Sequence, residues 1–144
     1  MNWKNEAIND LTTYKGRKQA AENIKERIKI LGEQFVSLKS VTPNEKVMGG
    51  KSRREEKILD NISERQRLEM NLSIVESFIQ LTEKGLSFLD KREKDVLEGF
   101  YFEQTDNHIN TLCRRFNFEK STLYRIKDEA LRKFTIAMYG AVDI

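Results

Sequence analysis

Apolar or long-stemmed side chains recur along the first part of the chain mostly at alternating steps of four and three residues, with one break of the heptad between Ala21 and Ile24. This spacing places them on one face of an α-helix and predicts one long amphipathic helix from about Asn5 to Leu38. Gly16 and Gly32 each cost about 1 kcal/mol in a helix, so any kink or early end is expected near one of them. The apolar or long-stemmed positions of the stripe are Ala7, Leu11, Tyr14, Lys18, Ala21, Ile24, Ile28, Leu31, Phe35 and Leu38.

A second stripe of the same kind follows after a break in the pattern. Residues 39–52 show no periodicity and contain Pro43 and the pair Gly49 and Gly50, so they predict a loop. A second long helix is expected to begin near Ser52 and to end between Lys84 and Leu86. Its inward positions are Ile58, Ile62, Leu68, Leu72, Val75, Ile79 and either Leu81 or Thr82, with Arg65 intruding.

Two amphipathic helices joined by such a loop predict an antiparallel, coiled-coil-like hairpin over residues 1–86. A hairpin of two helices buries little apolar surface by itself. We therefore expect it to pack on a second copy of the chain or on the C-terminal helices.

Residues 87–144 predict a second, compact helical domain. Asp90 is expected to cap a helix that carries Val96, Leu97, Phe100 and Tyr101. A short helix with Ile109, Leu112 and Phe116 inward then leads to Asn117, which tolerates the left-handed backbone of a sharp turn. The last helix, capped by Glu119, is expected to run to Tyr139 and to stop at Gly140, with Ile136 and Tyr139 docking on the hairpin. Its other buried positions are Leu123, Ile126, Ala130, Leu131 and Phe134.

The last two helices form a helix-turn-helix in an all-α protein, and the residues left off their apolar stripe are cationic or hydrogen-bonding. Lys120, Ser121, Tyr124 and Arg125 share the outward face at the start of the second motif helix, where such side chains contact base edges in a major groove. Seven basic residues stand against three acidic ones between Arg114 and Lys133. That local excess is what phosphate binding requires, although the whole chain carries a formal charge of only +3.

Composition excludes several other classes of function. No apolar run is long enough to span a bilayer, and the N-terminus lacks the apolar segment of a signal peptide, so we expect a cytoplasmic protein. The single cysteine, Cys113, is interpreted as a small packing residue, and the single histidine, His108, as a capping or exposed residue. The chain shows no nucleophile with a base, no metal-ligand spacing and no phosphate loop, so we expect neither an enzyme nor a cofactor.

Three segments of the C-terminal half resemble the fourth conserved region of bacterial sigma factors, which binds the upstream promoter element. They are Leu89–Leu97, Arg114–Asn117 and Ala130–Phe134. A long helical half joined to such a motif, in a short chain, also resembles phage and prophage regulators of the RinA, ArpU and Xpf types. The chain has no room for the other sigma regions.

The resemblance implies that Lys120, Ser121, Tyr124 and Arg125 approach base edges. Arg114, Arg115 and Lys127 are interpreted as phosphate contacts. Ser121 and Tyr124 stand where sigma factors generally carry Glu and Arg, and Arg125 replaces a Gln, which implies a different target sequence.

The sequence therefore predicts a DNA-binding transcription regulator, an activator of phage or prophage genes, whose partners are double-stranded DNA and RNA polymerase. The N-terminal helices are expected to form a homodimer. Two alternatives remain open at this point. One is a small terminase-like subunit for DNA packaging, and the other is an inhibitor that binds polymerase without DNA.

Overall fold

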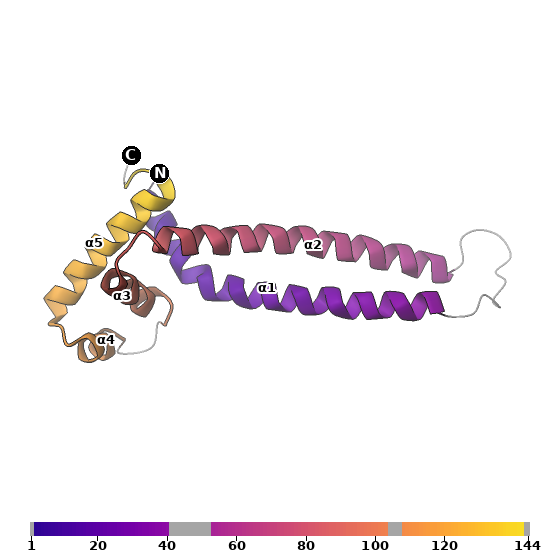
Figure 1. Cartoon of the computed structure of the whole chain (residues 1–144), viewed down its shortest axis with the longest axis horizontal. Coiled ribbons are helices and arrows are strands. Elements are labelled where there is room, and N and C mark those ends of the chain that lie inside the picture. Colours follow the sequence, from indigo (N-terminus) through magenta and orange to yellow (C-terminus); the bar gives the residue numbers. More distant parts are fainter. Residues whose placement is uncertain (1, 41–52, 104–107, 143–144) are drawn as a thin grey trace. The chain divides into compact units, whose positions relative to one another are not determined.

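A computed structural model describes residues 2–40, 53–103 and 108–142 of the chain, and every regular element in these ranges is a helix (Figure 1). The predicted all-α class is therefore confirmed. The helices are α1 (Trp3–Ser40), α2 (Arg53–Leu86), α3 (Lys91–Tyr101), α4 (His108–Phe116) and α5 (Lys120–Tyr139). Gly16 and Gly32 lie inside α1, and neither ends it. The expected cap at Ser52 and most of the loop at 39–52 lie outside the described residues.

The chain forms two compact units, and the boundary differs from the sequence-based division at residue 86. The first, here called the core unit, comprises Met1–Arg17 and Ser77–Ile144. The second, the hairpin unit, is Lys18–Glu76. The start of α1 belongs to the core unit because Ala7 and Leu11, both fully buried, form part of its hydrophobic core.

The hairpin unit pairs its two helical segments in antiparallel order. The Asn61 side chain donates from Nδ2 to the backbone carbonyl of Leu31 at 2.8 Å. Farther along, Arg54 donates from Nε to the carbonyl of Leu38, also at 2.8 Å. The earlier residue of α2 thus pairs with the later residue of α1, as an antiparallel hairpin requires, and the two segments lie side by side in Figure 1.

Arg65, which interrupts the apolar stripe of α2, has partners within the seam of the hairpin unit. Its guanidinium lies over the ring of Phe35, 4.5 Å from the centroid, and its Nε donates to Asn61 Oδ1 at 2.9 Å. The apolar positions of the seam, such as Ile28 and Leu68, are only half-buried. Two helices alone do not close this seam against water.

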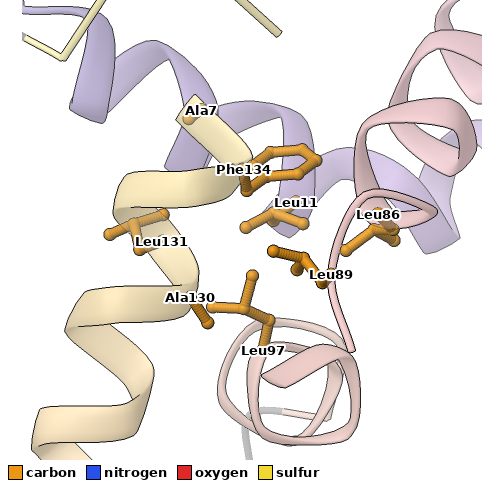
Figure 2. Packing of buried hydrophobic residues seen from close by; sticks show 8 residues of the cluster. All are labelled: Ala7, Leu11, Leu86, Leu89, Leu97, Ala130, Leu131 and Phe134. Atoms are coloured by element: carbon orange, nitrogen blue, oxygen red, sulfur yellow. The ribbon is translucent and has the colours of Figure 1, made fainter. Parts of the chain in front are cut away.

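The core unit is built around two neighbouring hydrophobic clusters. The first joins the start of α1, the end of α2 and the helices α3 and α5, and Figure 2 shows its side chains converging. Its buried members are Ala7, Leu11, Leu86, Leu89, Leu97, Ala130, Leu131 and Phe134. The second cluster joins α3, α4 and α5 through Val96, Phe100, Leu112, Leu123 and Ile126. Thr82, which is 1% exposed, takes the inward position of α2 that the pattern left open between Leu81 and Thr82.

The far end of α5 packs on the first turns of α1. The ring of Tyr139 stacks on Trp3 with centroids 5.1 Å apart, and its hydroxyl donates a hydrogen bond to the Asp10 carboxylate. Burial, followed by that hydrogen bond, raises the pKa of the Tyr139 hydroxyl. The predicted docking of Tyr139 is confirmed within the core unit. Ile136, in contrast, is 40% exposed, because it lies on the opposite side of the helix from the cluster around Phe134.

Candidate nucleic-acid interface

The turn between α4 and α5 has the geometry that the sequence predicts. Asn117 adopts a left-handed backbone with φ 56°, and the amide of Phe118 donates to the carbonyl of Cys113 at 3.0 Å. These two features reverse the chain over a few residues. The helix-turn-helix therefore begins α5 directly after α4, with Phe116 and Phe118 stacked across the turn at 6.0 Å.

The start of α5 is capped differently from the expectation. Glu119 is the N-cap residue, with extended backbone, but its side chain makes no capping hydrogen bond. The expected role of the Glu119 carboxylate is therefore wrong. Its backbone carbonyl accepts from the amide of Leu123 at 2.9 Å, which begins the helix without side-chain help. The free amides of this first turn remain available to an anion.

The predicted cap of α3 is present and extends into a capping box. Asp90 Oδ1 accepts from the amide of Glu93 at 2.8 Å, and the Asp90 amide donates back to Glu93 Oε1. The hydrogen bond from the Glu93 backbone is the main cause that lowers the pKa of the Asp90 carboxyl. The buried Glu93 also pairs through Oε2 with Lys133 Nζ at 2.9 Å, which joins α3 to α5.

The helix α4 packs against α3 at a position that the sequence did not single out. Gly99 on α3 is buried, and a Cβ atom at this position would lie 2.4 Å from Cδ2 of Leu112 on α4. A side chain at residue 99 would therefore require the Leu112 side chain to shift. The absence of a side chain at Gly99 leaves space for the Leu112 side chain in the second cluster.

The outward and inward faces of α5 separate as predicted. Leu123, Ile126 and Ala130 are at most 2% exposed. The four proposed base-contacting residues, Lys120, Ser121, Tyr124 and Arg125, are all exposed on the first two turns of α5. Arg125 Nη1 lies 3.7 Å from Oε1 of Glu129. Both side chains of this pair are more than half exposed, so the pair is weak and leaves the guanidinium available to another acceptor.

The three proposed phosphate contacts differ in their surroundings. Arg114 and Arg115 are exposed in the last turn of α4, with the Arg115 guanidinium 5.1 Å from the centroid of the Phe116 ring. The Lys127 side chain is only 17% exposed, and its Nζ contacts Asp128 Oδ1 at 2.7 Å. The structure thus leaves the two arginines open to solvent and holds the lysine close to the protein.

His108 and Cys113 lie at the edge of the second cluster. The His108 imidazole approaches the Phe100 ring edge-on at 5.8 Å, and Cys113 is half-buried against the cluster. In the part of the chain that the structure describes, no group of three or more potential ligands is placed to hold a metal ion. Within the same ranges, no helix is long and apolar enough to cross a membrane.

Comparison of the chain with family models, with curated proteins and with solved structures gives no match.

Proposed function

We propose that the protein is a sequence-specific DNA-binding regulator of transcription, an activator of phage or prophage genes, in which the first two turns of α5 enter the major groove. The observation that carries the proposal is the division of α5 into two faces. Leu123 and Ile126 are buried in the second cluster, and Lys120, Ser121, Tyr124 and Arg125 stand exposed together.

The dimensions and chemistry of this face suit a major groove. A helix with its side chains is about 10–12 Å across, and the groove is about 12 Å wide. Arg125 and Lys120 carry the donors that pair with O6 and N7 of guanine. Arg114 and Arg115, at the end of α4, are placed to neutralise phosphates beside the groove.

The hairpin unit supports a second part of the proposal, that the regulator binds DNA as a homodimer and contacts RNA polymerase. Its seam is half-buried within one chain, and packing against a second hairpin would remove more of that apolar surface from water. A dimer would also present two copies of α5 to two half-sites. Because the target is chromosomal or phage DNA, the proposal implies a cytoplasmic protein.

The first experiment tests base contact against phosphate contact. A duplex that the full chain selects from a randomised library serves as the specific site, and a scrambled duplex serves as the random one. Arg125→Ala is expected to weaken specific binding by about 1–3 kcal/mol and random binding by much less. Arg114→Ala is expected to weaken binding to both duplexes equally. It is also expected to reduce the slope of log affinity against log salt concentration by about 1, the equivalent of one released counterion.

The matched control is Arg67→Ala, which removes an exposed arginine from the hairpin unit and is expected to leave both affinities unchanged. Equal losses on specific and random DNA for both Arg125→Ala and Arg114→Ala would contradict the base-contacting assignment. No enriched sequence from the library would contradict sequence-specific binding altogether.

A packaging subunit is the second candidate, and the same half-buried seam favours it, since a ring of hairpins would also cover that surface. Light scattering on the full chain separates the candidates. A closed ring of about eight or more subunits would support packaging, and a monomer or dimer would support regulation.

A further inference from the structure

Tyr124 is the one aromatic side chain among the four exposed residues proposed to contact bases, and its ring packs against the protein. It meets the buried ring of Phe100, on α3, in an edge-to-face arrangement with centroids 5.7 Å apart and planes at 64°. Aromatic pairs favour this geometry because the positive edge of one ring meets the negative face of the other. Tyr124 nevertheless remains 37% exposed, so the residue is accessible from solvent.

Lys127 completes the support of that ring. Its ammonium lies 5.5 Å from the centroid of Tyr124 and 5.5 Å from the centroid of Phe100. Both distances are within the range of cation–π attraction. With Asp128 at 2.7 Å as well, the lysine charge already has three partners, and the side chain is 17% exposed.

These contacts set Lys127 apart from an ordinary phosphate-binding lysine, which uses a long, hydrated and mobile side chain. To reach a phosphate, the ammonium would have to leave two rings and a carboxylate. In its observed place, 5.5 Å from the Tyr124 ring centroid, we expect it to restrict the rotamers of Tyr124 before any DNA is bound. Restricting a side chain in its bound conformation reduces the entropy that binding removes.

We propose that Tyr124 recognises the C5-methyl group of a thymine in the major groove, and that Lys127 is a positioning residue for the Tyr124 ring rather than a phosphate ligand. The thymine methyl is the apolar group that the major groove presents, and the other three exposed residues are suited to hydrogen bonds. The inference rests on the proposed function, since it names the base feature that the same face of α5 contacts.

The experiment replaces each thymine of the library-selected duplex, one at a time, by deoxyuridine, which lacks only the methyl group. The affinity of the wild-type protein is expected to fall roughly fivefold when one particular thymine is replaced. Loss of a similar group from a closed apolar pocket lowers affinity at least about tenfold, and the loss here is smaller because water still reaches the groove. Tyr124→Ala is expected to abolish this thymine preference. Tyr124→Phe is expected to keep it, because the apolar ring is retained.

The role of Lys127 is tested on the same duplexes. Lys127→Met keeps an apolar stem and removes the charge, and it is expected to lower the thymine preference at that position while leaving the salt dependence unchanged. Lys127→Arg, which restores a cation over the rings, is expected to restore the preference. The matched control is Lys84→Met, which removes an exposed lysine at the end of α2 and is expected to change neither quantity.

Each result supports or overturns a separate part of the inference. If wild-type affinity survives every deoxyuridine replacement, Tyr124 contacts no thymine methyl. If Lys127→Met lowers the salt dependence by about one counterion and weakens random DNA equally, Lys127 is a phosphate ligand. A library without any enriched sequence would instead refute the proposed function itself. Thermal unfolding of each variant identifies a misfolded one, and Lys127→Gln then replaces Lys127→Met.

Discussion

Replacing Gly99 by alanine should destabilise the core unit although alanine favours helices. The new Cβ would lie 2.4 Å from Leu112 Cδ2, whereas carbon atoms in contact prefer about 3.5–4.0 Å. The Leu112 side chain would therefore have to retreat by about 1 Å. Leu112 is 4% exposed within the second cluster, so it has little space for that movement. Overpacking of this kind costs about 1–3 kcal/mol.

The helix-forming advantage of alanine opposes this cost by about 1 kcal/mol, which leaves Gly99→Ala destabilising by about 0–2 kcal/mol. Gly16→Ala provides the matched control in the same unit. Gly16 is exposed in α1, and a Cβ there would meet no atom within 4 Å. Gly16→Ala should stabilise by up to about 1 kcal/mol. Because the helix preference is common to both variants, their free energies of unfolding should differ by about 1–3 kcal/mol.

Urea unfolding followed by circular dichroism measures this difference, and a double mutant locates its source. In a Leu112→Ala background the clashing methyl group is gone, so Gly99→Ala should become neutral or stabilising there. The interaction energy between the two substitutions should then be close to the overpacking cost. The reasoning is refuted if Gly99→Ala stabilises the wild type as much as Gly16→Ala does, or if the two substitutions at 99 and 112 are strictly additive.

Two further predictions concern the cap of α3 and the division of the chain. Hydrogen bonding from Glu93 lowers the pKa of Asp90, so the stability that its carboxylate provides is complete above the unfolded pKa of about 3.9 and is lost as the pH falls through the folded pKa. Asn is also a good N-cap residue but does not titrate. In Asp90→Asn the urea concentration at the midpoint of unfolding should therefore change less with pH below about pH 4 than in the wild type, and an equal change would contradict this. Replacing residues 18–76 by a short Gly/Ser linker should leave a core unit that still unfolds cooperatively on heating. Two contacts hold the ends that the linker joins: the Tyr14 hydroxyl donates to Glu83 at 2.7 Å, and the Arg17 guanidinium lies 4.5 Å from the centroid of the Phe78 ring. A fragment of residues 87–144, which lacks Leu11 and Leu86, should not unfold cooperatively, and a cooperative transition would contradict the division.

Local periodicity predicted the helices and the faces of α5, because the positions buried by a helix are set by its own repeat. Leu123, Ile126 and Ala130 follow that repeat, and Asn117 and Gly140 stand where backbone conformation selects particular residues. These features depend on neighbours within a few positions along the chain. They are therefore visible without a structure.

The division into units depends on contacts that periodicity does not encode. The apolar stripe of α1 keeps its heptad spacing across Arg17 and breaks it only between Ala21 and Ile24, so the spacing does not place the boundary that separates Leu11, in the core unit, from Leu31, in the hairpin unit. Glu93 is a similar case. A charged residue predicts exposure, yet the Glu93 carboxylate is buried, and the capping box and the pair with Lys133 offset the cost of removing its charge from water.

The sequence predicts which residues share the outward face of α5, but it does not predict what each of these residues contacts. Spacing alone places Tyr124 and Arg125 on the same outward surface of α5. The position of Lys127 depends on Phe100, which lies on another helix. A basic residue considered from the sequence alone suggests an exposed charge, whereas the Lys127 side chain is only 17% exposed. Roles that depend on tertiary partners therefore need the structure.

Polar side chains of α2 that hydrogen-bond to backbone carbonyls of α1 favour one register of the hairpin unit. A heptad stripe repeats itself, so a shift of one helix by seven residues would still align apolar positions. Such a shift would separate Asn61 from the Leu31 carbonyl and Arg54 from the Leu38 carbonyl. Asn61 is 5% exposed, and leaving its side-chain amide buried and unpaired would cost about 1–3 kcal/mol. The bond from Asn61 to the Leu31 carbonyl thus favours the observed pairing over any register in which the Asn61 amide meets no acceptor.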